Sequence, residues 1–246
     1  MAGSSENRTV RNYVAYALLL GVLVAVHFIL AANPQAARSA SQAAVFSWQG
    51  LGVTAGAGLV GVFCLTLTAL PGLWEARIGW GRKVITPIAI GLALGALEAA
   101  TDHVTNWGAQ MAADAKVATI HIAWPLSVPI YGGGAVLVSI LYFLTLLPLG
   151  VWLVSTLLLR GKALDLVYWL FAVPIAFVEP LTQGDFTAIP KYGAPAAAFA
   201  VEDLALNLAQ VWVLRRAGFV AAVLVRVAFY AVWHVAWGWW RANGGS

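Results

Sequence analysis

Long apolar runs separated by short polar stretches follow one another along almost the whole chain. Because about 20 apolar residues are needed for a helix to cross a bilayer, each run predicts one transmembrane helix. The predicted spans are residues 13–32 (an uncleaved first helix), 45–70, 84–102, one within 121–159, 163–181, 197–214 and 218–240. The pattern therefore predicts an all-α, polytopic membrane bundle of about seven helices over residues 13–240. Residues 1–12 are predicted to be a cytoplasmic N-terminal tail, and residues 241–246 a C-terminal tail.

The uncharged stretch 121–159 is too long for one straight span and just long enough for two. Basic residues decide between these possibilities, because Lys and Arg are enriched in cytoplasmic loops. One crossing puts nine basic residues inside and four outside, whereas two crossings divide them about evenly. The inside set is Arg8, Arg11, Arg77, Arg82, Lys83, Arg160, Lys162, Arg215 and Arg216, and the outside set is Arg38, Lys116, Lys191 and Arg241. We therefore predict one crossing, with His121 to Gly134 as a kinked or re-entrant entry, and a cytoplasmic N-terminus in the plasma (inner) membrane.

Composition agrees with a membrane protein and excludes several other classes. Hydrophobic residues make up 61% of the 246, charged residues 10%, and the mean hydropathy is +0.83, whereas soluble domains carry about 25% charged residues. The net charge of +4 is explained by topology-setting Lys and Arg, so nucleic acid is not an expected partner. The single cysteine, Cys64, excludes disulfides and thiolate metal sites within the chain. The expected partners are the lipid bilayer and a lipophilic small molecule.

Ionisable residues in the apolar segments form the candidate site, because charge in hydrocarbon is costly and marks function by default. The acidic members are Glu98, Asp102, Glu179, Glu202 and Asp203, and the histidines are His27, His103, His121 and His234. With seven helices, these groups converge on the outer half of the bundle.

Two stretches, 95–101 and 176–182, also suggest an internal repeat. They align Glu98 with Glu179 and Thr101 with Thr182, and the same offset aligns His121 with Glu202. Repeats are common in membrane folds that hold a site between two halves.

The adjacent pair Glu202 and Asp203 carries the sharpest chemical signal. Two neighbouring carboxylates in a low dielectric cannot both ionise cheaply, so one is expected to keep its proton. A carboxylic acid in a dry pocket is able to protonate an olefin or a similar weak base. Asn207 and Gln210 lie about one and two turns further along the same predicted helix and are expected to supply hydrogen bonds.

The run Ala200-Val201-Glu202-Asp203-Leu204 resembles the acidic motif of the lycopene cyclase domain and of similar membrane-bound terpene cyclases. Residues 101–108 and 178–186, the latter including Gly184-Asp185-Phe186, resemble the elements that precede this motif. The pattern departs from the family at Ala200, where proline is usual, and before Asp102, where tryptophan is usual. The resemblance implies a helical-bundle enzyme of the isomerase class, linked to carotenoid biosynthesis, that cyclises or isomerises an isoprenoid without metal or nucleotide cofactor.

The resemblance also implies roles for individual residues. The expected catalytic carboxylates are Glu202, Asp203, Glu98, Glu179 and Asp102. The expected substrate-binding residues are Trp124, Phe199, Asn207, Trp212, Tyr230 and Trp233, whose aromatic members would stabilise cationic intermediates through their π faces.

Three other functions remain open. Glu202-Asp203-x-x-x-Asn207 and Tyr230-x-x-x-His234 resemble motifs of CPBP-type intramembrane proteases, in which glutamate and histidine activate water. The Trp-rich segment 230–240 resembles the end of the A-type subunit of copper membrane monooxygenases, and a metal would then be held by His121, His234 and Glu202. A non-enzymatic transporter or assembly protein is the third.

Arg226, inside the seventh predicted span, bears on the transport alternative. A polar path that links Arg226 and Asp165 to the outer cluster would favour transport. For Arg226 itself, we expect snorkelling to the inner interface rather than an ion pair with Asp165.

Overall fold

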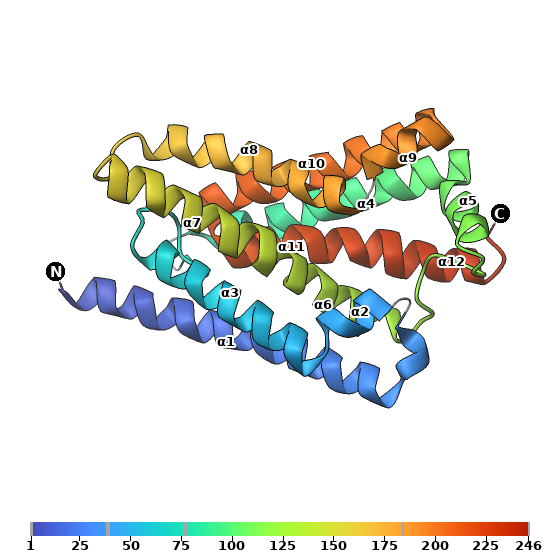
Figure 1. The fold of residues 1–246 in the computed structure, drawn as a ribbon, viewed down its shortest axis with the longest axis horizontal. Coiled ribbons are helices and arrows are strands. Elements are labelled where there is room, and N and C mark those ends of the chain that lie inside the picture. Colours follow the sequence, from blue (N-terminus) through green and yellow to red (C-terminus); the bar gives the residue numbers. More distant parts are fainter. Residues whose placement is uncertain (1, 38–39, 76–77, 184, 246) are drawn as a thin grey trace.

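The computed structural model describes residues 2–37, 40–75, 78–183 and 185–245, which form a bundle of long helices lying side by side (Figure 1). Arg38, Arg77 and Gly184 lie outside the described residues. Seven helical segments are long and apolar enough to cross a membrane: Asn7–Ala32, Trp48–Thr66, Gly81–Thr105, Ser127–Leu158, Leu164–Gln183, Ala194–Ala217 and Phe219–Ala242. No strand occurs within the described ranges. The predicted all-α membrane bundle, its seven spans and the single crossing of 121–159 are confirmed.

Several spans are built from more than one helical element. The first three spans and their connections comprise α1 (Ala2–Ala32), η1 (Pro34–Ala36), α2 (Ala40–Val45), α3 (Trp48–Thr66), η2 (Gly81–Ile85) and α4 (Thr86–Thr105). The middle of the chain comprises α5 (Trp107–Asp114), α6 (Ser127–Ser139), η3 (Ile140–Leu146), α7 (Leu147–Val151), η4 (Trp152–Leu158) and α8 (Leu164–Gln183). The last part comprises α9 (Asp185–Tyr192), α10 (Ala194–Ala217), α11 (Phe219–Tyr230), η5 (Ala231–Trp237) and α12 (Gly238–Ala242).

The two ends of the bundle differ in their connections. Figure 1 shows the N-terminus at one end, here called the near end, and the C-terminus at the opposite or far end. The short helices α5 and α9 lie at the far end, each between two long helices. The two stretches that the repeat hypothesis pairs therefore share one order of elements: a long helix, a short helix and a second long helix.

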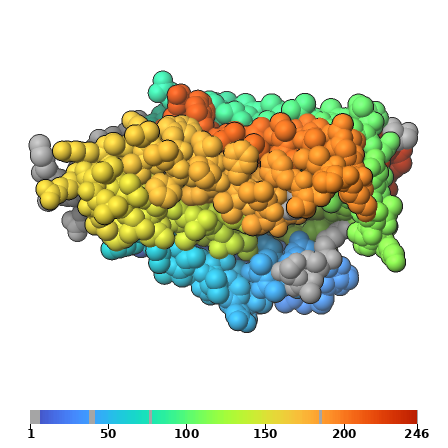
Figure 2. Space-filling view, turned by 45° about the horizontal axis from the view of Figure 1, so that its top comes forward, coloured from blue at the N-terminus to red at the C-terminus, as the bar shows by residue number. Residues whose placement is uncertain are grey.

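The face built by α8, α9 and α10 is continuous in the space-filling view (Figure 2). It presents large apolar side chains: Leu166, Leu170, Val173, Leu181 and Val201 are all at least 39% exposed. Exposed apolar surface of this extent is what a lipid-facing helix requires.

Close contact between α4 and α11 sets the distance between the two halves of the candidate site. A Cβ on Gly91 would lie 2.1 Å from the carbonyl oxygen of Val225, and one on Gly95 would lie 2.7 Å from that of Phe229. The spacing of the two glycines puts both on one face of α4, as in the small-residue contacts of membrane helices. This contact places Glu98, one turn further on, beside α11.

The first helix begins earlier than residue 13, where the apolar run starts. Residues 2–12 continue α1 as helix, and Asn12 is completely buried, where its Oδ1 accepts a hydrogen bond from the backbone N–H of Leu73 at 2.9 Å. The guanidinium of Arg8 donates to the carbonyl oxygen of Leu70. Arg8 and Asn12 precede the apolar run and hold the loop after α3, a role that the hydropathy pattern does not reveal.

The predicted entry to the fourth span is correct in position but too long. The irregular part ends at Leu126, and α6 begins at Ser127, so Gly132, Gly133 and Gly134 lie inside a regular helix. Gly133 packs against Val26, where a Cβ would lie 2.5 Å from Cγ2. At this position glycine provides room for a neighbouring helix rather than a break.

Candidate functional site

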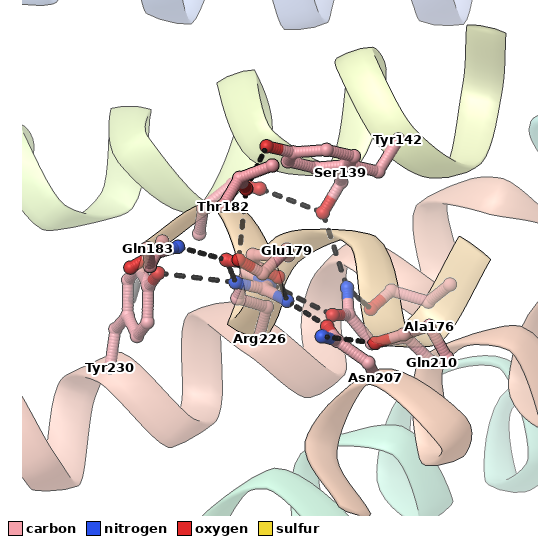
Figure 3. A network of polar contacts seen from close by, with 12 residues as sticks. Ser139, Tyr142, Ala176, Glu179, Thr182, Gln183, Asn207, Gln210, Arg226 and Tyr230 are labelled. Carbon is pink, nitrogen blue, oxygen red and sulfur yellow. Dashed lines mark hydrogen bonds and ion pairs between the residues drawn. The ribbon is translucent and has the colours of Figure 1, made fainter. Parts of the chain in front are cut away.

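A buried ion pair lies at the centre of the site. Arg226 of α11 is 2% exposed, and its Nη1 and Nη2 donate to Oε1 and Oε2 of Glu179 in α8 (Figure 3). This bidentate arrangement matches the planar guanidinium to the carboxylate and gives both charges a partner in low dielectric. The expectation that Arg226 snorkels is wrong, because Glu179 satisfies it inside the bundle. Asp165 pairs instead with Arg215 at 2.5 Å, so Arg226 and Asp165 belong to separate ion pairs.

Two amides of α10 complete the shell around Arg226. Gln210 Oε1 accepts a hydrogen bond from Arg226 Nε at 2.8 Å, and Asn207 Oδ1 accepts one from Nη2. The amide nitrogens hold the surrounding helices, since Asn207 Nδ2 donates to the carbonyl oxygen of Ala176 at 3.0 Å and Gln210 Nε2 to Ser139 Oγ at 3.2 Å. Asn207 was expected to bind substrate and Gln210 to support the acidic pair. Both instead serve the ion pair, and the network joins α6, α8, α10 and α11 (Figure 3).

A small cavity of about 100 Å³ borders this network on its far-end side. Its wall includes Glu98, Glu179, Asp203, Arg226, Tyr230, Trp233 and His234. Glu98 is 3% exposed, and Asp203 is half-buried. Three carboxylates therefore share one cavity with Arg226 and His234.

A second cavity of about 250 Å³ continues from the first, with which it shares Glu98, Gln183, Asp203, Trp233 and His234. Its remaining wall is largely aromatic and apolar. The rings of Trp107 and Phe199 lie 5.6 Å apart between centroids, and those of Phe199 and Trp233 lie 5.5 Å apart. Phe199, Tyr230 and Trp233, which the sequence predicts to bind substrate, each line at least one of these two cavities, and Trp107 joins them. We call the two spaces together the inner cavity.

Glu202 and Asp203 do not act as a pair sharing one pocket. Adjacent residues on an α-helix project about 100° apart, and only Asp203 lines the inner cavity. Glu202 turns towards α4, where Thr101 Oγ1 donates to its Oε1 at 2.6 Å. Its Oε2 is buried and has no hydrogen-bond partner among the described residues. The two acids are therefore neighbours in the sequence, but the helix directs their side chains into different surroundings.

Asp102 belongs to a different space. A vestibule of about 630 Å³ at the far end is lined by Asp102, His121, Arg241 and small residues of α5. Asp102 is 1% exposed, and it accepts hydrogen bonds from the backbone N–H of Gly108 at 2.5 Å and from Trp237 Nε1 at 2.8 Å. These donors tie the ends of α4, α5 and η5 together, so Asp102 has a structural role beside the vestibule.

Two histidines meet between the vestibule and the inner cavity. His121 lines the vestibule, His234 lines the inner cavity, and their Nδ1 atoms are 3.5 Å apart. The ring of His234 also stacks on Tyr131, with centroids 4.1 Å apart. His121, His234 and Glu202, the residues that would hold a metal in the monooxygenase alternative, do not form a cluster. In the described part of the chain, no group of three or more His, Cys, Asp or Glu side chains is placed to bind a metal ion.

Two tryptophans predicted to bind substrate lie elsewhere. Trp124 is 61% exposed, in the irregular segment before α6. Trp212 is 37% exposed towards the near end of α10, where the guanidinium of Arg216 lies 4.4 Å from the centre of its ring. Neither residue lines the inner cavity. The sequence alone does not distinguish a tryptophan at the membrane boundary from one beside a cavity.

The sequence-based prediction missed Arg226 as part of the site, although its spacing carried a signal. Arg226, Tyr230, His234 and Gly238 recur at every fourth position, which puts them along one face of the last span. In the structure this face runs from the ion pair, past the inner cavity, to His121. The element η5, a π-helix, carries Trp233 and His234, and such widened turns are frequent at functional sites.

No protein-family model, curated protein or solved structure matches this chain. The seven spans identify it as an integral, multi-pass membrane protein.

Proposed function

We propose that this protein is a membrane-embedded enzyme that starts the cyclisation or isomerisation of a lipophilic isoprenoid with a buried carboxylic acid. One observation carries the proposal: Asp203 and Glu98 line the same cavity as the aromatic side chains Trp107, Phe199 and Trp233. The implied similarity to the lycopene cyclase domain supports the same chemistry, with Asp203 and Glu98 in place of Glu202 as the acids that meet the substrate.

The charge around the inner cavity supports the presence of an acid that holds a proton. Glu98 and Asp203 line a cavity whose remaining wall is largely apolar and aromatic, so ionising both acids at once is costly there. The protonated member donates its proton to one carbon of a double bond and leaves a carbocation. The other carboxylate removes a proton from a neighbouring carbon after ring closure or double-bond migration. The product is an isomer of the substrate, and no redox partner is needed.

The aromatic wall supports a cationic intermediate. Trp and Phe attract a cation over the ring face, by about 0.5–2 kcal/mol each depending on desolvation. A cavity of about 250 Å³ suits one end group of a long isoprenoid, with the remainder of the chain in lipid.

A hydrolase is the second candidate. His234 lines the inner cavity together with Glu98 and Asp203, and a carboxylate with a histidine forms the general-base pair that activates water. This arrangement agrees with the resemblance of Tyr230-x-x-x-His234 to CPBP-type proteases.

The two candidates differ in their products. Purified protein in lipid nanodiscs would be supplied with a panel of acyclic isoprenoids, from monoterpenes to carotenoids, in D₂O. We expect an isomer of the substrate in which deuterium from the solvent replaces hydrogen. Formation of this product is expected to be lost in Asp203→Asn or Glu98→Gln and kept in Trp124→Leu. Cleavage of a peptide or ester substrate, lost in His234→Gln, without any isoprenoid product would establish the hydrolase instead.

A further inference from the structure

The vestibule and the inner cavity are separated by a thin wall. Helix α5 forms much of it, because Trp107 and Met111 face the inner cavity whereas Gly108 and Ala112 face the vestibule. Ile120 belongs to both linings. The side chains of this wall are largely apolar, so it separates a polar space at the far end from the carboxylates inside.

His121 and His234 bring polar atoms to both sides of this wall. His121 is 4% exposed and lines the vestibule, and His234 lines both parts of the inner cavity. Their Nδ1 atoms face one another at 3.5 Å, the upper limit of a hydrogen bond. The Nε2 atom of each ring therefore lies away from the contact.

The surrounding residues hold the two rings in this position. Tyr131 stacks on His234 with an angle of 5° between the ring planes, and the Tyr131 hydroxyl accepts a hydrogen bond from the backbone N–H of Ile122, next to His121. Gly238 makes room for His121, because a Cβ there would lie 2.7 Å from the Cβ of His121. One tyrosine thus stacks on His234 and binds the backbone next to His121, and one glycine makes room for the His121 side chain.

We propose that the His121–His234 pair conducts protons between the vestibule and the carboxylates Glu98 and Asp203. A neutral imidazole accepts a proton at one nitrogen and releases one from the other. A proton from vestibule water enters His121 at Nε2, the Nδ1 proton passes to His234 Nδ1, and the Nε2 proton of His234 is released into the inner cavity. Tautomer exchange then restores both rings. This inference rests on the proposed function, since it supplies the acid that starts the reaction.

The charged groups on both sides favour this direction of supply. Asp102 and Arg241 face the vestibule, and Glu98, Asp203, Glu179, Arg226 and Tyr230 face the inner cavity. Glu98 and Asp203 line the same two spaces as His234, so they are the acids that a proton released there would reach.

Infrared spectroscopy tests the relay without any substrate. Protonated carboxylic acids give a C=O stretching band that shifts when the acid exchanges hydrogen for deuterium. The band of the inner cavity is assigned as the one removed by Asp203→Asn or Glu98→Gln, and its exchange is timed after transfer of the protein into D₂O. We expect His121→Phe to slow the exchange by at least about tenfold. His103→Phe is the matched control, because His103 packs at the same end against Trp237 and Trp240.

The outcomes separate the relay from the acid chemistry. A band that exchanges equally fast in wild type and His121→Phe would overturn the relay and leave the proposed function standing. The absence of any band sensitive to Asp203→Asn or Glu98→Gln would overturn both. If His121→Phe melts at a much lower temperature than wild type, His121→Gln replaces it, because glutamine keeps hydrogen-bonding groups but does not carry a proton.

Discussion

Arg226 in the seventh span and Glu179 in the fifth form a bidentate ion pair inside the bundle. Removing one partner of such a pair leaves an uncompensated buried charge, which costs about 3–5 kcal/mol. We therefore expect Arg226→Met and Glu179→Met each to lower the thermal stability in detergent strongly. The double variant is expected to be more stable than the sum of the single effects predicts, and a strictly additive result would contradict direct pairing.

The glycine contact between α4 and α11 gives a second prediction. Gly91→Ala places a Cβ against the Val225 carbonyl and is expected to destabilise the protein by about 1–3 kcal/mol, as overpacking does. Gly132→Ala is the matched control, because Gly132 is also helical and nothing lies within 4 Å of the added Cβ. Thermal melts that rank the two variants in the reverse order would show that the helices do not approach at Gly91.

The anchor at the start of α1 gives a third prediction. Asn12→Ala removes the acceptor for the buried N–H of Leu73 and is expected to cost about 1–3 kcal/mol. Asn7→Ala, at an exposed position of the same helix, is expected to leave the melting temperature unchanged. Equal melting temperatures for both variants would mean that residues near the N-terminus form a free tail after all.

The aromatic wall gives a prediction about activity. Phe199→Leu keeps an apolar side chain but loses the π face, so we expect isoprenoid turnover to fall between roughly twofold and thirtyfold. Trp124→Leu is expected to have no effect, since Trp124 is exposed outside the cavity. A similar loss in both variants would argue that the aromatic rings act through lipid contact instead.

The orientation of the bundle is testable by cysteine labelling. Cys64 is buried and is first replaced by alanine. Lys162→Cys then reports on the near end and Lys116→Cys on the far end, both at exposed positions. We expect a membrane-impermeant maleimide to label Lys116→Cys in intact cells and Lys162→Cys only after permeabilisation, because the near end carries the excess of basic residues. The reverse labelling would place the N-terminus outside.

The sequence predicted the spans well and the partners poorly. Hydropathy and basic residues identified seven helices, including the single crossing of 121–159, because transfer into lipid dominates their energetics. Pairing inside the bundle depends on how helices rotate about their axes, which hydropathy does not determine. Glu202 and Asp203 therefore faced different neighbours than expected, and Arg226 found Glu179 rather than the interface. The spacing of Arg226, Tyr230 and His234 held the missing information, since it already placed all three on one helix face.

The order in which the buried charges enter the membrane follows from the position of Arg226. During synthesis Glu179 is inserted with the fifth span, and Asn207 and Gln210 follow with the sixth, all before the arginine that binds them. Until the seventh span arrives, this acid and these amides face hydrocarbon or one another, which is a costly state. Insertion of the last span therefore supplies the arginine that binds Glu179, Asn207 and Gln210 and removes this cost.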